Sequence, residues 1–376
     1  MFVFGIVLAI LGALFGLPEM RDRLGIDLAQ QGDIFLSLFF GVFLSTLVVG
    51  PMIDSFGNKL VLTISAVLVT MALAAFAGAN SFQMGVAAAF VLGVGGGGLN
   101  TAANALVADL YAENRGEMLN ILGTFYGFGA LFIPLLAAII TGFFTIPQLF
   151  LAAASLAAIL AIFYLVLRFP QPKERIGFSL LASIRAAAIP GVLLFAFLLF
   201  FQSGNESAIG GWTSTYLGAM GAGPRTATWI LAGYWAALMV GRLLAVQMLK
   251  RVTKAQLVLM SGIGSAIGCA ILLISRSIGL MAVGAVIVGL SFAAIYPTVL
   301  AMAADRYQRL AGTIFGFLFA VGLIGGMLFP WSIGHISESY GLRSGMFIPL
   351  FGAIAISVIA VILSRADGEG SPAYKR

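Results

Sequence analysis

Two stretches of the chain that lie 196 residues apart decide the fold. Residues 93–111 read GVGGGGLNTAANALVADLY, and residues 289–307 read GLSFAAIYPTVLAMAADRY. Both are largely apolar, and both end in Ala-Asp-x-Tyr. The same offset relates further pairs of glycine or proline: Gly116 and Gly312, Gly129 and Gly325, and Pro134 and Pro330. Because these matches keep one register, the sequence predicts a chain built from two repeated halves.

The composition excludes most soluble classes of protein. Of the 376 residues, 61% are hydrophobic and 9% are charged, whereas a soluble domain carries about 25% charged residues. The net charge of +6 does not indicate a nucleic-acid-binding face, because Lys and Arg are scattered singly between apolar blocks. A soluble enzyme, a nucleic-acid binder and a disordered chain are therefore poor interpretations, and the expected surroundings are a lipid bilayer.

Twelve apolar segments account for most of the chain, and each is long enough to be a membrane-spanning helix, which takes about 20 residues. The runs are continuous rather than alternating, which favours helices over barrel strands. They cover approximately 2–18, 34–53, 60–79, 83–107, 117–140, 146–168, 189–217, 226–248, 256–275, 278–303, 310–334 and 343–364. We therefore expect an all-α integral membrane protein with twelve transmembrane helices in two pseudo-symmetric six-helix bundles.

The longest polar stretch, from Arg168 to Arg185, separates six segments from six. It predicts an N-terminal bundle over 1–168, a cytoplasmic linker over 169–188, and a C-terminal bundle with a short cytoplasmic tail over 189–376. Parallel six-span repeats are typical of one class of secondary transporter, in which the substrate lies between the halves near the middle of the bilayer.

The distribution of cations predicts the orientation. If the first terminus is cytoplasmic, 15 of the 20 Lys and Arg residues fall in cytoplasmic segments and 5 on the other side. This bias predicts a multi-pass protein of the inner membrane with both termini in the cytoplasm. We expect it to be a monomer.

The sequence offers little for covalent or metal chemistry. Cys269 is the only cysteine and His335 the only histidine, which excludes an intrachain disulfide and a His-rich metal site. No nucleophile–base pair, metal cluster or phosphate loop is evident. The glycines of residues 93–98 spell a dinucleotide-binding pattern, but they lie within a span and are expected to serve packing. We predict neither an enzyme nor a bound cofactor.

Residues 50–59, which read GPMIDSFGNK, resemble the G-x-x-x-D-x-x-G-x-[RK] loop of the major facilitator superfamily. Gly50 is expected to allow close approach of helices, Asp54 to lie against a helix N-terminus or pair with a cation, and Gly57 to permit a tight reversal. The resemblance implies a conformational latch on the cytoplasmic side; an ordinary charged turn is the alternative. The residues of this latch would be Gly50, Asp54, Gly57, Lys59 and, as partner of the acid, Arg115.

Three further stretches resemble the fucose permease and sodium-glucose transporter branch of that superfamily. They are residues 98–104 (GLNTAAN), residues 119–130, and residues 204–216 with Gly-Asn-Glu, Gly-Trp and Tyr. The resemblance implies transport of a monosaccharide. Fucose permease couples sugar to protons through two acids, but this chain has Leu14 and Asn100 at those places, and neither side chain titrates. Coupling to H⁺ or Na⁺ through another group stays open.

Glu206 is the most informative single residue, because it lies inside the seventh apolar segment, where an ionisable group usually faces a cavity or a partner. Gln202 and Asn205 share its helix face. Amides and a carboxylate suit a polyhydroxyl ligand, since each hydroxyl both donates and accepts, and Trp212 offers a flat face for a sugar ring. The alternative is a protonated Glu206 that hydrogen-bonds between helices.

Asn100 and Asn104 are four residues apart and share a face of the fourth segment. Contact with a ligand and hydrogen bonding between helices are both open to them. Asn120 and Tyr126 are weaker candidates for the same site. Four further aromatic residues are expected mostly to anchor the chain at the membrane interface. They are Trp229, Tyr234, Trp235 and Trp331.

These observations lead to the hypothesis of a secondary active or facilitative transporter that moves a small polar solute, first of all a glucose-like monosaccharide, by alternating access. An exporter of hydrophobic or cationic compounds on the same fold is the main alternative. A receptor, scaffold or intramembrane enzyme is the third.

Overall fold

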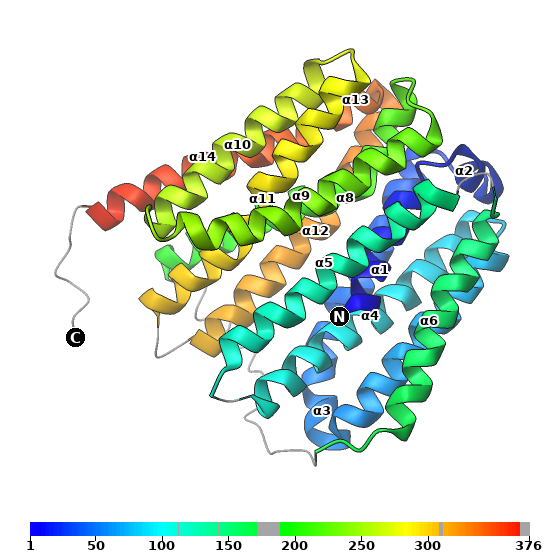
Figure 1. Ribbon diagram of the computed structural model, residues 1–376, viewed down its shortest axis with the longest axis horizontal. Helices are drawn as coiled ribbons and strands as arrows, with labels where there is room; N and C mark the ends of the chain where they lie inside the picture. Colours follow the sequence, from blue (N-terminus) through cyan, green and yellow to red (C-terminus); the bar gives the residue numbers. More distant parts are fainter. Residues whose placement is uncertain (112, 141–142, 171–188, 308–310, 369–376) are drawn as a thin grey trace. The chain divides into compact units, whose positions relative to one another are not determined.

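The computed structural model describes residues 1–111, 113–140, 143–170, 189–307 and 311–368, and these fold as helices joined by short connections (Figure 1). The helices, in chain order, are α1 (Phe2–Leu14), α2 (Pro18–Leu24), α3 (Leu28–Gly78), α4 (Phe82–Leu110), α5 (Arg115–Ile140), α6 (Ile146–Val166), α8 (Pro190–Ala219), α9 (Pro224–Met248), α10 (Lys254–Ile274), α11 (Ile278–Arg306), α12 (Ala311–Tyr340), α13 (Leu342–Gly345) and α14 (Phe347–Gly368).

Most of the predicted apolar segments correspond to one helix each, whereas 34–53 and 60–79 share α3 and 343–364 extends over α13 and α14. A straight helix of 51 residues would be about 75 Å long, more than twice the hydrocarbon thickness of a bilayer. The helix is broken at Gly57, whose φ of 79° and ψ of 163° are not helical. The reversal predicted at Gly57 is therefore confirmed, and α3 contains two spans. Across the described residues, ten helices are long and apolar enough to cross a membrane, and an eleventh is possible if α1 and α2 count as one.

The first predicted span, 2–18, is shorter in the structure. Helix α1 ends at Leu14, and α2 runs at 90° to it. Gly25 ends α2 with a φ of 62°, a left-handed conformation that favours glycine. Helix α3 then begins with a capping box, in which the Asp27 carboxylate accepts from the backbone N–H of Gln30 and the Gln30 side chain accepts from that of Asp27.

The structure repeats as the sequence predicts. Helices α4 and α11 begin and end 196 residues apart. Their C-caps, Tyr111 and Tyr307, have nearly the same backbone angles, φ −120° with ψ 54° and φ −127° with ψ 45°. Gly129 of α5 lies against the backbone of Phe2, and its counterpart Gly325 of α12 lies against the backbone of Phe200. Equivalent glycines thus allow equivalent close approaches of helices in the two halves.

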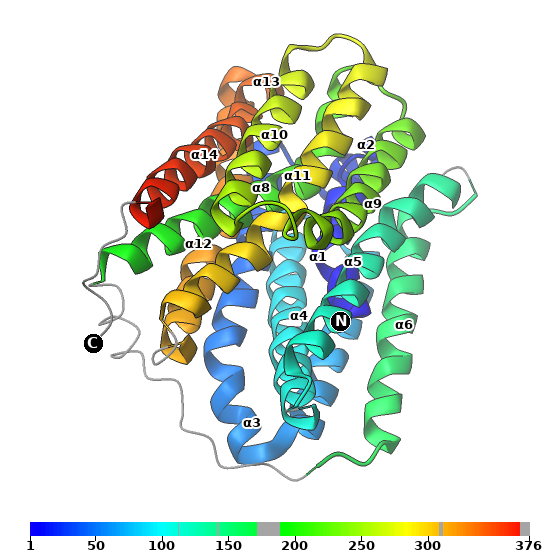
Figure 2. The ribbon, with the colours of Figure 1, turned by 60° about the vertical axis from the view of Figure 1, so that its left-hand side comes forward.

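The glycine run of α4 serves packing. A Cβ at Gly93 would overlap the backbone of Leu38, and one at Gly95 or Gly98 would overlap Ser65. These neighbours all belong to α3, which lies along α4 (Figure 2). The prediction that residues 93–98 serve packing is confirmed.

By contacts, the chain forms two compact units. One comprises Met1–Phe178, Ser207–Trp235 and Met327–Gly345, and the other comprises Ser179–Glu206, Ala236–Gly326 and Met346–Arg376. This grouping does not follow the predicted boundary, because two segments of the second half pack with the first. The division into 1–168 and 189–376 stays a prediction, and nearly all of the predicted linker 169–188 lies outside the described residues.

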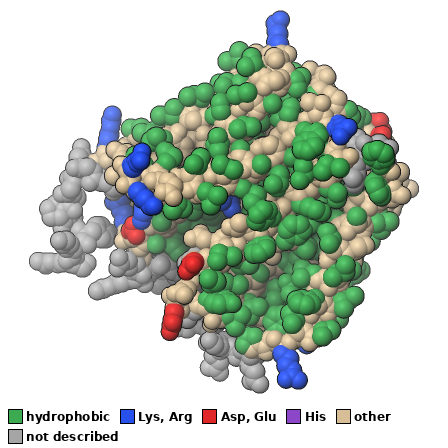
Figure 3. Space-filling view, in the orientation of Figure 1, with side chains coloured by type: hydrophobic (Ala, Val, Ile, Leu, Met, Phe, Trp, Pro, Cys, Tyr) green, Lys and Arg blue, Asp and Glu red, His purple; other side chains and the backbone are tan. Residues whose placement is uncertain are grey.

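The molecular surface suits a bilayer. Hydrophobic side chains cover most of the face seen in Figure 3, and Lys and Arg lie mainly near its margins. Large apolar side chains are strongly exposed along the helices; Ile159, Leu243 and Ile362 are examples. Such an extensive apolar surface would not be stable in water and is expected to face lipid.

Candidate functional site

Asn100 and Asn104 of α4 are bonded to each other. The Asn104 Nδ2 donates to the Asn100 backbone oxygen at 2.8 Å and to the Asn100 Oδ1 at 3.0 Å. Both side chains are half-buried. The pair therefore occupies one helix face, as the spacing predicts, and it leaves the Asn100 Nδ2 as a donor and the Asn104 Oδ1 as an acceptor for a further partner.

Asn120 and Tyr126 lie on α5. Asn120 is exposed, and its backbone oxygen accepts from the hydroxyl of Thr124. The Tyr126 ring packs between Phe4, at a centroid distance of 5.6 Å, and the edge of Trp235, at 6.3 Å. Tyr126 thus takes part in an aromatic cluster that joins α1, α5 and α9.

Trp212 is fully buried in the same unit. Its Nε1 donates to the Pro330 backbone oxygen at 3.1 Å, and its ring packs on Phe35 at 6.0 Å. Pro330 lies within α12, so this bond ties α8 to α12. The contacts recorded for Trp212 are with protein groups, and the predicted stacking on a sugar stays a prediction.

Gln202 and Asn205 are fully buried in the other unit. The Gln202 Nε2 donates to the Phe292 backbone oxygen at 3.3 Å, whereas its Oε1 has no hydrogen-bond partner among the described atoms. With its amide oriented to fit its surroundings, Asn205 donates to Pro349 O at 3.2 Å and accepts from Ala353 N at 3.1 Å. Asn205 therefore bridges the backbone of α14.

Glu206 is half-buried on α8. It lies in the same unit as Tyr296 of α11. The Tyr296 ring stacks on Phe319 of α12. Because a carboxylate in hydrocarbon is costly, the partly buried Glu206 is expected to face a cavity or a partner.

The residues of the predicted cytoplasmic latch agree with the structure to different degrees. Asp54 and Lys59 are half-buried on either side of the break at Gly57. The prediction that Gly50 permits a close helix contact is wrong for this structure, since no described atom lies within 4 Å of the place where its Cβ would be. The side chain of Arg115 lies outside the described part of the chain, so its pairing with Asp54 stays a prediction.

A polar cluster that the sequence did not indicate joins α3 to α12. The Trp331 Nε1 donates to Asp33 Oδ1 at 3.0 Å, and the His335 Nε2 lies 3.7 Å from the same oxygen. The second distance suits an ion pair but is too long for a hydrogen bond. The residues are 298 or more positions apart, and neither histidine nor aspartate stands in a recognisable motif, so no local signal could have revealed their proximity.

Two further bonds connect the same regions. The backbone N–H of Leu28 donates to Glu338 Oε2 at 3.0 Å, and the Gln31 Nε2 donates to the Thr215 hydroxyl at 3.2 Å. Helices α3 and α12 also approach closely here, because Gly334 lies against the backbone of Gly32 and Leu28. These contacts fasten the start of α3 to the later parts of α8 and α12.

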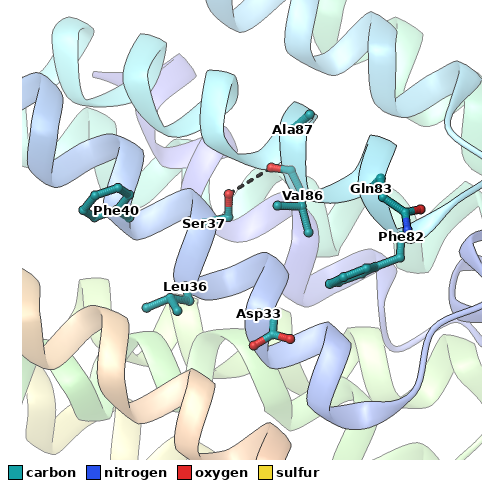
Figure 4. A pocket seen from close by; sticks show the side chains of 8 residues that line it. All are labelled: Asp33, Leu36, Ser37, Phe40, Phe82, Gln83, Val86 and Ala87. Carbon is teal, nitrogen blue, oxygen red and sulfur yellow. Dashed lines mark hydrogen bonds between the residues drawn. The ribbon is translucent and has the colours of Figure 1, made fainter.

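Asp33 also lines an open groove of about 700 Å³ between α3 and α4 (Figure 4). Its walls are residues 33, 36, 37 and 40 of α3 and residues 82, 83, 86 and 87 of α4. The Ser37 hydroxyl donates to the Val86 backbone oxygen at 2.9 Å and joins the two walls. The Asp33 carboxylate is the one charged group of this mostly apolar lining.

The expectation that most of the four further aromatic residues anchor the chain at the membrane interface is wrong. Tyr234 and Trp235 are buried inside the protein, and Trp331 is bonded to Asp33. Only Trp229, with 44% of its surface exposed, could serve as an anchor among the four. Sequence position alone could not separate the buried face of α9 from its exposed face.

A model of the Major Facilitator Superfamily matches residues 1–221 and 195–375, which together cover nearly the whole chain. The chain belongs to the Major Facilitator Superfamily. The predicted fold of twelve spans agrees with this membership, and the proteins it resembles are transporters rather than enzymes.

Individual relatives are distant, and two of them align over most of this chain. The uncharacterised transporter y4wD of Sinorhizobium fredii is 23% identical over 93% of this chain and 92% of its own. The sodium-dependent glucose transporter 1A of Mus musculus is 21% identical over 99% and 98%. The multidrug resistance protein MdtL of Shewanella oneidensis matches only part of the chain, with 26% identity over 48% of it and 44% of its own length.

Among solved structures, the fucose:proton symporter of E. coli superposes with a TM-score of 0.65 and 18% identity over 96% of this chain and 97% of its own. The resemblance to the sugar-transporting branch of this superfamily, first seen in three short stretches of sequence, is thereby confirmed.

Proposed function

We propose that this superfamily member carries a glucose-like monosaccharide across the inner membrane by alternating access. The family establishes a membrane transporter of small molecules; the choice of sugar is the proposal. The similarity over the whole chain to a protein named as a sodium-dependent glucose transporter supports it, whereas the match to a multidrug resistance protein covers less than half of the chain.

The observation that carries the proposal is the Asn100–Asn104 pair. Its internal bond orients both amides and leaves one donor and one acceptor close together. A sugar hydroxyl donates and accepts at once, so it can satisfy both groups, whereas a hydrophobic or cationic compound can satisfy at most the acceptor. The pair is uncharged, which gives no electrostatic preference for a cation.

The proposal includes coupling to H⁺ or Na⁺ and an orientation with both termini in the cytoplasm. Glu206 is the candidate coupling group in the second half, since Leu14 and Asn100 cannot titrate. We expect the substrate to contact Asn100, Asn104 and Asn120; contacts of Gln202 and Glu206 with the substrate stay a prediction from the sequence.

A binding measurement on the purified protein tests this assignment. Replacing Asn104 by Ala removes the acceptor and frees the Asn100 amide, and the loss of about 1 kcal/mol would weaken glucose binding about fivefold. Asn80→Ala is the matched control, because Asn80 is exposed in the connection before α4. An equal affinity of the two variants for glucose would remove the support that the pair gives.

A competition arm separates the two candidate substrates. A lipophilic cation such as tetraphenylphosphonium should not displace glucose from the wild-type protein. The exporter is the correct interpretation if three results are found together: the wild-type protein binds the cation tightly, Glu206→Gln binds the cation more weakly, and neither protein binds glucose.

A further inference from the structure

The contact between α3 and α12 is charged at its centre. The Asp33 carboxylate meets the indole N–H of Trp331 and the imidazole of His335, and the side chains of Asp33 and His335 are 36% and 39% exposed. His335 Nδ1 lies 3.0 Å from the Trp331 backbone oxygen and its ring packs on the Trp331 ring at 4.4 Å, so the imidazole is held beside the carboxylate.

This cluster links the two halves of the transporter. Helix α3 belongs to the first repeat and α12 to the second, yet both of these regions lie in one compact unit. The proposed orientation puts this end of the helices outside the cell. Separation of α3 from α12 at the outer end would break the bonds of Asp33 and the bond from Leu28 to Glu338 together.

We propose that Asp33, Trp331 and His335 form a proton-binding latch that holds the outer end of the transporter closed. The inference rests on the proposed function in assuming that this end faces the outside of the cell and that it opens and closes. The Trp331 N–H orients the carboxylate at any pH. A proton taken up on His335 Nε2 creates a positive charge 3.7 Å from Asp33 Oδ1 and adds an ion pair to the closed state.

The groove between α3 and α4 gives the proton a route. Asp33 lines this open groove while its bonds to α12 are formed (Figure 4), and its side chain is 36% exposed. The imidazole beside it is itself partly exposed. The latch can therefore exchange protons with the outer solution without first opening.

The direction of the pH effect follows from the charges. When pH falls through the range in which imidazoles gain a proton, the closed outer end becomes more stable; when pH rises, the ion pair is lost and opening is favoured. The other charged residues of the neighbouring elements are acids and arginines, and His335 is the only histidine in the sequence. They are Glu19, Arg21, Asp22 and Arg23 on α2, Asp27 before α3, Glu338 on α12 and Arg343 on α13, while α4 has no titratable side chain between residues 82 and 104.

Distance measurement between spin labels tests the latch independently of transport. In a Cys269→Ala background, Met84→Cys on α4 and Ser339→Cys on α12 place labels at exposed positions of the two halves. Because the pair is more than one-third exposed, the ratio of closed to open protein should fall about two- to fivefold between about pH 5.5 and about pH 8.5.

Three variants and one control decide the result. His335→Gln and Asp33→Asn should each abolish the response of the label distances to pH. Trp331→Phe should keep the response to pH but favour the open state at every pH. The control Lys254→Gln breaks the exposed ion pair of Lys254 with Asp305 in the other unit. It should change neither the response to pH nor the ratio of closed to open protein.

A pH response that persists in His335→Gln, or label distances that never respond to pH in the wild type, would overturn the latch. Flux assays on the same proteins separate the two hypotheses. Loss of the pH response in His335→Gln without any sugar flux in the wild type would support the latch and reject the sugar. Normal sugar flux with label distances insensitive to pH would reject the proton-binding latch and support the sugar as substrate.

Discussion

The crossing of α3 and α12 offers the sharpest test of how the halves are held together. At Gly334, a methyl group would lie 2.9 Å from the Cα and 3.1 Å from the N of Gly32, and it would also overlap the Leu28 carbonyl. These neighbours are backbone atoms, which cannot rotate away as a side chain could. Gly334→Ala must therefore push the two helices apart by several tenths of an ångström or more.

The destabilisation of the closed state by Gly334→Ala can be estimated from this geometry. Forcing an extra carbon into a packed contact costs about 1–3 kcal/mol, and here the closed outer end bears the whole penalty, because separation of the helices relieves it. The ratio of closed to open protein should then fall about 5- to 150-fold. Gly78→Ala is the control, since Gly78 also lies in α3 and no described atom lies within 4 Å of its Cβ position.

The assay is the label distance between positions 84 and 339, combined with sugar exchange in vesicles. We expect Gly334→Ala to shift the distances towards the open form and to slow exchange, because the closed outer end becomes rare, while Gly78→Ala behaves as the wild type. Unchanged distances in Gly334→Ala would mean that α3 and α12 do not need to approach as closely as described, and the reasoning would fail.

Three smaller predictions concern stability and binding. Gly57→Ala should destabilise the protein by about 1–2 kcal/mol, because φ is 79° there, and thermal unfolding of the detergent-solubilised protein checks this. Asn205→Ala should lower the unfolding temperature by several degrees, through the loss of about 1–3 kcal/mol from the bridge to α14; a glucose affinity that falls with unchanged stability would instead place Asn205 in the binding site. Trp212→Phe should likewise reduce stability by about 1 kcal/mol and leave glucose affinity unchanged, because the Trp212 N–H is bonded to Pro330; calorimetric titration with glucose distinguishes the two effects.

Much of the fold could be predicted because the bilayer imposes a simple rule. Backbone polar groups must be satisfied within each span, so long apolar runs can only be helices, and their number and order follow from the sequence. The sequence repeat also predicted that α4 and α11 are equivalent helices, and both their first and their last residues are 196 positions apart. Gly57 was identified because a reversal between two spans needs a backbone angle that glycine adopts readily.

The candidate site was less predictable because it depends on which face of each helix is buried and by what. The spacing of Asn100 and Asn104 was enough to predict that they share a helix face, but not that they bond to each other. The same reasoning could not show that Asn205 would bond to the backbone of α14 or that Trp235 would be buried. Asp33 and His335 could not be paired from the sequence at all, because their proximity follows from the crossing of two distant helices.

The central claim, that the protein moves a monosaccharide, is tested most directly by counterflow in vesicles that contain only this purified protein. Vesicles loaded with unlabelled glucose should accumulate labelled glucose transiently and saturably, and tetraphenylphosphonium should not compete. Labelled glucose that enters no faster than into protein-free vesicles, with either a proton or a sodium gradient imposed, would contradict the account.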